Sequence, residues 1–234
     1  MKIFLLLVLF SGIGFLLIDN LRFLSNSGFS LGAATHYYVT QGFEQTGALN
    51  LVSSILYDFR AFDSLGESTV IFAAVSGIVS LLSRKTLPVS SHGLSIIVKR
   101  IFGILTPFLF VSGIYLILHG HLSPGGGFQG GVILGTISIV FCIVYGSSFD
   151  YTRYSPQSKT ILEVSGALLF LAMGIIGIFL EGFFLANWFS SPERLGKLLT
   201  PGSIFGINLG VGIKIGAGLS IIFYSIIQKR IEGK

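Results

Sequence analysis

The sequence has little charge, almost no cysteine and little proline. Only 11% of its 234 residues are charged, against about 25% in an ordinary soluble domain. With 52% hydrophobic residues and a mean hydropathy of +0.84, this excludes a soluble enzyme and a disordered chain. Six prolines without a glycine repeat exclude a collagen-like chain. The remaining class is a polytopic α-helical membrane protein.

The single cysteine, Cys142, stands inside an apolar run. It has no second cysteine with which to pair, which excludes a disulfide scaffold, and no neighbouring ligands for a metal cluster. We therefore expect a small buried hydrophobic residue. The sequence predicts no redox centre, no metal site and no bound cofactor.

Long apolar runs predict an all-α fold with six membrane-spanning helices, because a hydrocarbon core of roughly 30 Å needs about 20 helical residues. The runs are Ile3–Ile18, Glu67–Leu82, Ile101–Leu118, Gly126–Tyr145, Val164–Ala186 and Ile204–Ile227. The first run also resembles a signal peptide. It leads directly to Asp19 and Asn20 without a small-residue cleavage site, so a retained helix is favoured.

Basic residues are distributed unevenly between the two sides of these six spans. One side carries Lys2, Arg84, Lys85, Lys99, Arg100, Arg153, Lys159, Lys229, Arg230 and Lys234, and the other carries Arg22, Arg60, Arg194 and Lys197. Because basic residues stay in the cytoplasm, this distribution predicts that both termini are cytoplasmic. The formal charge of +5 therefore reflects topology and not a nucleic-acid partner.

A polar segment from Arg84 to Arg100 has the composition of a cytoplasmic linker. It divides the chain into a two-helix unit at residues 1–90, which has a long segment on the outer side, and a four-helix unit at residues 91–234. We find no internal repeat of the kind that marks the inverted halves of secondary transporters. This counts against a self-sufficient carrier or channel.

The segment Ala48–Phe62 has apolar residues at spacings of three and four, which predict an amphipathic helix at the outer interface. Asp63 follows it. Ser64 with Glu67 three residues later has the form of a capping box that would start the second span. A role for Glu67 in proton handling is equally supported, and the two roles are compatible if the cap also faces a watery cavity.

The segment from His119 to Gly131 is rich in glycine. Ser123–Pro124 is typical of a helix start, so we expect the fourth span to begin there. His119 and His121 are two residues apart, and a helix would not place them on one face for a metal. Packing or hydrogen bonding explains them, and so does a proton relay.

The last span contains Lys214, about ten residues from the outer end and hence ~15 Å deep. An unpaired lysine at that depth costs at least ~2.5–3.5 kcal/mol, so Lys214 needs a partner. The candidates are Glu181, Glu67 and a group supplied by another polypeptide. Small residues that let helices approach closely are expected at Pro124, Gly125, Gly126, Gly127, Gly130, Gly131, Gly210, Gly212 and Gly216.

Three segments resemble known components of antiporters. His119–Gly131 resembles the G-H-x-x-P-G-G-G-F-x-G-G signature of the MrpB (MnhB) component of Mrp-type multisubunit cation/proton antiporters, and Asn208–Lys214 resembles that family's last span. Thr46–Glu67 is similar to the end of the large MrpA component, or to the MbhE component of membrane-bound hydrogenases that contain Mrp modules. These pieces are usually separate polypeptides, whereas here they are fused.

The resemblance implies a subunit of a Na⁺/H⁺-translocating assembly in a prokaryotic plasma membrane. Its partners would be other Mrp-type subunits, membrane lipid and, in a redox-driven host, hydrogenase or ferredoxin-oxidoreductase subunits. The chain itself would not be an enzyme and would not bind nucleic acid. The ion-path candidates are Lys214, Glu67, Glu181, His119, His121 and Asp63. The alternative is a purely structural scaffold, in which each polar group is a cap or a packing contact.

Overall fold

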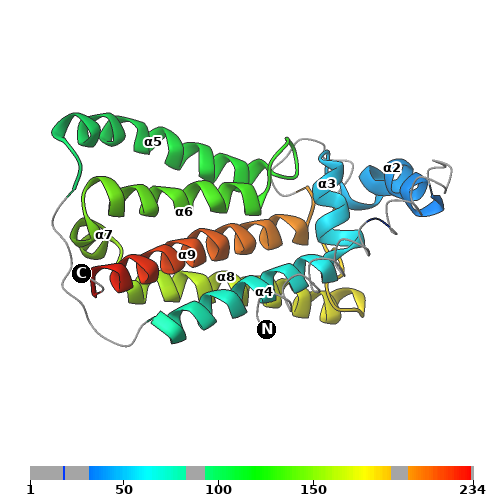
Figure 1. Cartoon of the computed structure of the whole chain (residues 1–234). Helices are drawn as coiled ribbons and strands as arrows, with labels where there is room; N and C mark the ends of the chain where they lie inside the picture. Colours follow the sequence, from blue (N-terminus) through cyan, green and yellow to red (C-terminus); the bar gives the residue numbers. More distant parts are fainter. Residues whose placement is uncertain (1–17, 19–31, 83–92, 191–199, 233–234) are drawn as a thin grey trace. The chain divides into compact units, whose positions relative to one another are not determined.

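The computed structural model describes residues 18, 32–82, 93–190 and 200–232 (Figure 1). Its helices are α2 (Ala33–Thr46), α3 (Leu51–Ser54), η1 (Ile55–Phe59), α4 (Ala61–Leu82), α5 (Ile96–His119), α6 (Gly127–Val144), α7 (Ser147–Arg153), α8 (Pro156–Glu181) and α9 (Ser203–Glu232). Contacts divide the chain after Tyr37. All the contacts described below lie in the second unit, residues 38–234.

Five of these helices, α4, α5, α6, α8 and α9, are long and apolar enough to cross a membrane. This confirms the prediction of an all-α, multi-pass membrane protein. The predicted span Ile3–Ile18 falls almost entirely outside the described residues. The cytoplasmic placement of both termini remains a prediction.

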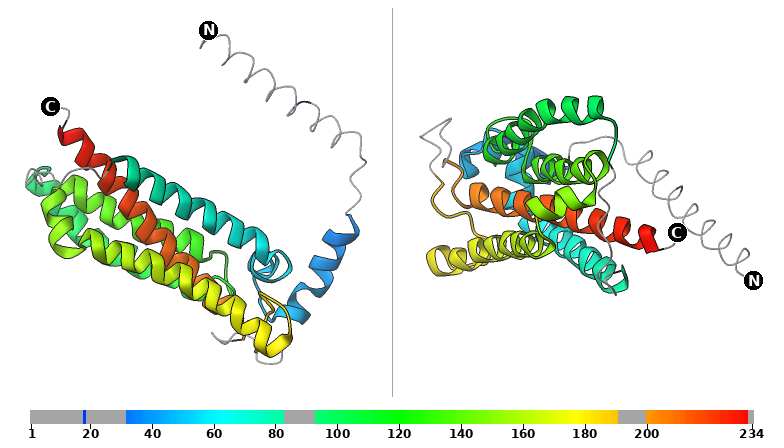
Figure 2. Two further views of the ribbon diagram at one scale, coloured as in Figure 1. Left: turned by 90° about the horizontal axis from the view of Figure 1, so that it is seen from below. Right: turned by 90° about the vertical axis from the view of Figure 1, so that its left-hand side faces the viewer.

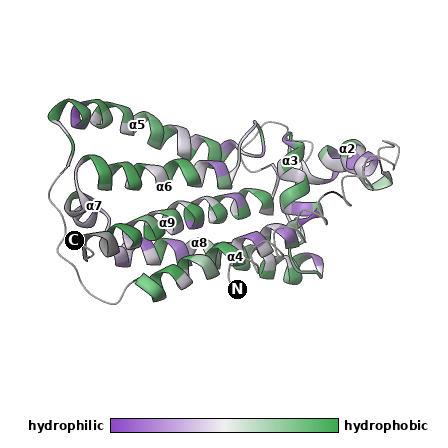
Figure 3. Cartoon of the chain, in the orientation of Figure 1, coloured by the Kyte–Doolittle hydropathy of each residue, from purple (hydrophilic) through white to green (hydrophobic). Residues whose placement is uncertain are grey.

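Helix α9 is the centre of the bundle. It packs against α4, α5, α6 and α8, and it lies between α6 and α8 in Figure 1 and among the other helices in Figure 2. Within an apolar 18-residue stretch of α9, 67% is buried inside the protein, whereas the corresponding stretches of α4 and α5 are each only 11% buried. Both of these outer helices are mainly hydrophobic in Figure 3. Their exposed apolar surface suits lipid or another polypeptide of a complex.

Backbone contacts at glycine hold α9 close to its neighbours. A Cβ on Gly131 of α6 would lie 2.6 Å from the carbonyl oxygen of Gly212, and one on Gly166 of α8 would lie 2.6 Å from that of Gly210. Both distances are too short for any side chain. The α6–α9 and α8–α9 interfaces therefore require glycine at these positions.

Helix α6 begins at Gly127 and not at Ser123–Pro124 as the sequence predicts. The Gly127 backbone N–H donates to the Asn208 side-chain oxygen on α9. The Asn208 amide nitrogen donates to the Ile117 carbonyl near the end of α5, at 2.8 Å. A residue from a distant helix therefore caps α6 and ties three helices together.

The predicted amphipathic helix Ala48–Phe62 is broken into α3, the π-helical turn η1 and the start of α4. Arg60, between η1 and α4, departs from helical geometry with φ −125° and ψ 36°. Ser64 and Glu67 therefore lie inside α4, and the predicted capping box does not start it. The Ser64 hydroxyl donates instead to the Leu56 carbonyl across the turn.

Candidate functional site: a buried lysine and carboxylate between three helices

Lys214 lies at the middle of α9 and is only 1% exposed. Its ammonium is 5.7 Å from the centre of the Phe72 ring on α4. The backbone of Lys214 is held against α8, since a Cβ on Gly166 would lie 2.7 Å from the Lys214 nitrogen. The lysine is thus fixed between α4, α8 and α9, away from both ends of its helix.

Glu163 of α8 is the carboxylate whose charge acts on the Lys214 ammonium. Glu163 is 3% exposed. The Lys214 Nζ and the Glu163 Oε1 atoms have no hydrogen-bond partner among the described residues. Buried polar atoms are almost always hydrogen-bonded, so these two orphaned groups call for an explanation.

Glu163 was not among the sequence-predicted candidates, which named Glu67 and Glu181 as partners within the chain. Apolar content alone placed the start of the span at Val164, whereas α8 begins at Pro156. The signal that could have identified Glu163 is helical register. The buried face of α8 comprises Lys159, Glu163, Gly166, Phe170, Gly174 and Gly177, a spacing of three and four that includes both charges.

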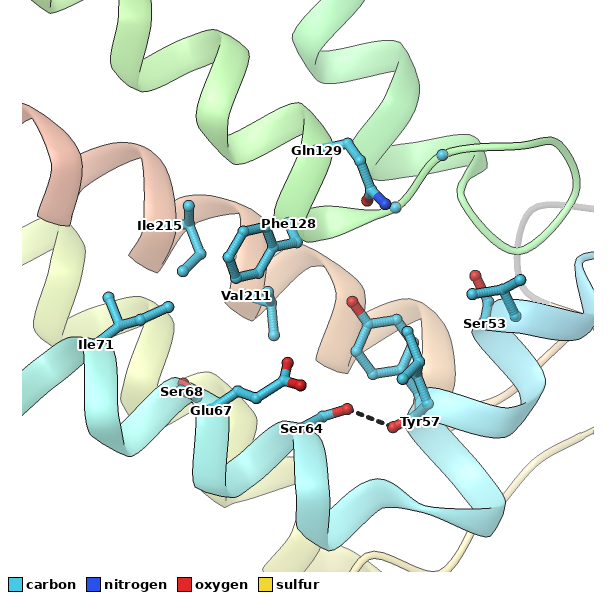
Figure 4. Close-up of a pocket in the computed structure, with 14 residues that line it drawn as sticks. Ser53, Tyr57, Ser64, Glu67, Ser68, Ile71, Phe128, Gln129, Val211 and Ile215 are labelled. Atoms are coloured by element: carbon cyan, nitrogen blue, oxygen red, sulfur yellow. Dashed lines mark hydrogen bonds between the residues drawn. The ribbon is translucent and has the colours of Figure 1, made fainter. Parts of the chain in front are cut away.

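Glu67 lines a separate cavity of about 220 Å³, here called the Glu67 cavity. Figure 4 shows its carboxylate pointing into this space. Tyr57, Ser64 and Gln129 are among the other lining residues. Ser68 lines both this cavity and a second one of about 260 Å³ that contains Lys214. Ser68, which follows Glu67 in the sequence, is thus a wall residue that the two cavities share.

Two groups at the η1 turn, outside the membrane spans, have pKa values above their ordinary ones. Burial, and then the charge of Glu67, raises the pKa of the Tyr57 hydroxyl above its ordinary value. Burial raises the pKa of the Asp58 carboxyl to about 6. A tyrosine hydroxyl is neutral at physiological pH even at its ordinary pKa, so Tyr57 gives the wall of the Glu67 cavity an uncharged hydrogen-bonding group.

The two candidate histidines lie at the connection between α5 and α6. His121 is completely buried and its ring is edge-on to Phe205, with centroids 6.1 Å apart. His119 ends α5 and stacks on Tyr115 at 4.4 Å. This connection is fixed to α3, because the Asn50 backbone N–H donates to the His121 carbonyl at 2.9 Å. The connection that carries both histidines is therefore hydrogen-bonded to the start of α3.

The remaining charged candidates lie apart from Lys214. Asp63 is exposed and forms an ion pair with Arg60 at the start of α4. Glu181 is exposed at the last residue of α8. Within the part of the chain that the structure describes, no three His, Cys, Asp or Glu side chains gather as metal ligands.

The predicted packing residues lie at helix contacts and in the α5–α6 connection. Gly130 faces α5, Gly127 and Gly131 face α9, Gly210 faces α8, Gly212 faces Ile117 of α5 and Gly216 faces Gly131 of α6. Pro124 is exposed. Gly125 and Gly126 have φ angles of 149° and 159°, which residues with a Cβ rarely adopt.

A bundle of apolar helices joined by close glycine contacts defines a multi-pass membrane protein. Residues 97–221 match the family described as a domain related to the MnhB subunit of Na⁺/H⁺ antiporters. Residues 5–95 match the MbhE family, a component of MBH. The chain belongs to the MnhB-related family, and it is a membrane subunit of the Mrp antiporter type.

The chain is also similar to individual proteins. An uncharacterised protein of Methanocaldococcus jannaschii is 32% identical over 217 residues, covering 80% of this chain and 76% of that protein. A putative antiporter subunit mnhB2 of Staphylococcus saprophyticus is 30% identical over 135 residues, covering 54% and 93%. A chain in the structure of the archaeal membrane-bound sulfane sulfur reductase, a respiratory membrane complex, is 29% identical with a TM-score of 0.77, and 97% of this chain and 98% of that chain are covered.

Proposed function

We propose that this subunit provides part of a proton path in a multisubunit Na⁺/H⁺-translocating complex. The observation that carries the proposal is the Glu163–Lys214 pair, which is buried and whose Lys214 Nζ and Glu163 Oε1 atoms have no hydrogen-bond partner among the described residues. Ionisable groups within membrane spans are costly and are usually retained for transport. A pair kept only for stability would be expected to form direct hydrogen bonds.

The chemistry of the pair suits proton transfer. A proton shared between the Lys214 amine and the Glu163 carboxylate leaves the net charge of the pair at zero, whichever group holds it. We assign the role of next proton acceptor to the Glu67 carboxylate, because its cavity shares Ser68 with the cavity that Lys214 lines. Arrival of a cation in a neighbouring subunit would favour the neutral form of Lys214 through electrostatic repulsion.

The other candidates are assigned smaller roles. His119 and His121 hold the α5–α6 connection, and Asp63 and Glu181 lie at helix ends where they would meet a partner protein or the lipid surface. The subunit would not itself be an enzyme and would act without a cofactor. Its location would be the prokaryotic plasma membrane.

The host complex is proposed to be a redox-driven one. The similarity to a chain of a respiratory membrane complex spans almost the whole of both chains, whereas the mnhB2 relative covers only 54% of this chain. Purification of the complex and identification of its subunits tests this point. Iron–sulfur or nickel–iron proteins among the partners are the expected result, and a complex of antiporter subunits alone would contradict it.

Replacement of Lys214 by methionine tests the transport role. The variant K214M keeps most of the side-chain volume and removes the charge, and K99M makes the same change near the start of α5 as a matched control. Cation-driven proton flux in membrane vesicles, divided by the amount of assembled complex, is expected to fall at least about tenfold in K214M, as for loss of a proton-transferring group. K99M should transport as the wild type does.

The scaffold alternative predicts a different outcome for the same variants. If Lys214 only supports packing, K214M will lower the amount of assembled complex while the flux per complex stays at the wild-type level. That result would contradict the proposed path.

A further inference from the structure

A buried ion pair lies where α6 ends and α8 begins, and the proton path described above does not use it. Lys159 of α8 forms an ion pair with Asp150 of α7, with side-chain exposures of 5% and 0%. The Ser138 hydroxyl on α6 donates to the Asp150 carboxylate at 2.7 Å and accepts from the Lys159 ammonium at 3.0 Å. Three elements thus meet at one charged cluster.

Lys159 also stands one helical turn from Glu163. Residues four apart lie on the same helix face with Cβ atoms about 5–6 Å from each other, and both side chains belong to the buried face of α8. The Lys159 ammonium therefore has two carboxylates within reach of its flexible stem. Asp150 is in contact with it, and Glu163 has an orphaned Oε1 atom.

Free space borders the Lys159 side chain toward α6 and α9, and Glu163 is not among the residues that line it. A cavity of about 220 Å³ is lined by Lys159, and polar groups at its wall include Ser138 and Ser220. On the α9 side, the Lys159 ammonium lies 5.1 Å from the centre of the Tyr224 ring. An aromatic face and two hydroxyl groups can hold an ammonium between two positions.

The charges along this line alternate in sign. Asp150, Lys159, Glu163 and Lys214 follow one another from the α7 end of the bundle to the middle of α9, and the four formal charges sum to zero. Among the described residues, the other titratable side chains at the cluster include Cys142 of α6, which lies beside Asp150, Tyr224 of α9 and Tyr154, which lines the same cavity as Lys159. A neutral set is what burial of charges demands.

We propose that Lys159 is a mobile ammonium that moves between Asp150 and Glu163 and thereby couples proton uptake at Asp150 to proton release from Lys214. This rests on the proposed function. One proton binds to Asp150, which releases the Lys159 ammonium. The ammonium then pairs with the Glu163 carboxylate, and Lys214, having lost its counterion, gives one proton to the Glu67 side. One proton enters, one leaves, and the net charge is unchanged.

The two lysines have different requirements, and this supplies the test. Lys159 keeps its proton throughout, whereas Lys214 must lose one, and arginine does not deprotonate in proteins. Flux per assembled complex should fall at least about tenfold in K159M and in K214M. K159R should restore a large part of the flux lost in K159M. K214R should restore none of the flux lost in K214M.

A control separates the relay from structural support. The double variant D150N/K159M replaces the ion pair with uncharged residues, so the complex should assemble, yet its flux should stay at the K159M level. E44Q on the exposed part of α2 is the carboxylate control and should transport normally. Wild-type flux in D150N/K159M, or failure of K159R to restore flux in a normally assembled complex, would overturn the relay. Wild-type flux in K214M would overturn the proposed function itself.

Discussion

Replacement of Gly166 by alanine tests how the position of Lys214 depends on the α8–α9 contact. The added Cβ would lie 2.6 Å from the Gly210 carbonyl oxygen, 2.7 Å from the Lys214 nitrogen and 2.9 Å from the Lys214 Cβ. All three neighbours are backbone or near-backbone atoms, which cannot rotate away. The helices must separate by several tenths of an ångström, and overpacking of this kind costs about 1–3 kcal/mol.

The matched control is Gly77→Ala on α4. A Cβ at Gly77 meets nothing within 4 Å, and alanine is a better helix former by about 0.5–1 kcal/mol. Thermal unfolding of the purified complex in detergent should therefore show a lower midpoint for G166A and an equal or higher one for G77A. Proton flux per complex should fall in G166A alone, because the lysine moves relative to Glu163. The reasoning would be refuted if G166A matched G77A in both measurements.

Three further variants test separate parts of the structure. Asn208→Ala removes the cap on Gly127 and the bond to Ile117, and should lower complex stability by about 1–3 kcal/mol in thermal unfolding; an unchanged midpoint would contradict the role of Asn208 in joining the helices. Because the Asp58 pKa is raised to about 6 in the folded state, the folded state binds more protons than the unfolded one between about pH 4 and 6, and stability is lost as pH rises through 6. Asp58→Asn should thus stabilise the complex at pH 8, by at most about 3 kcal/mol, and not at pH 4; equal effects at both values would contradict the burial of this charge. Glu67→Gln should reduce cation-driven proton flux while the amount of complex stays normal, and full flux would remove Glu67 from the path.

Hydropathy predicted the five spans that the structure describes, because membrane insertion depends on the apolar content of a run of residues and not on contacts with the rest of the chain. Helix starts were harder to predict. Ser123–Pro124 is a good local start signal, yet the start of α6 is fixed by Asn208, which is 81 residues from Gly127 in sequence. No local pattern can reveal a cap supplied from a distant helix.

Of the buried pair, the sequence predicted Lys214 but not its partner, because the partner again depends on contacts between distant helices. The depth of Lys214 within its run identified it as a charge in need of a partner. The partner, Glu163, lies in a turn of α8 that is too polar to count as membrane-spanning by composition, although burial continues through it to Lys159. The relative depth of two antiparallel helices follows from the Gly166–Gly210 contact, which the sequence does not specify.

The central claim is that the Glu163–Lys214 pair exists for transport and not for stability. The double variant E163Q/K214M tests it most directly, because it removes both charges together and leaves no uncompensated ion in the bundle. Our account predicts normal assembly and an unfolding midpoint at or above that of the wild type, with cation-driven proton flux per complex reduced at least about tenfold. Wild-type flux in the assembled double variant would contradict it.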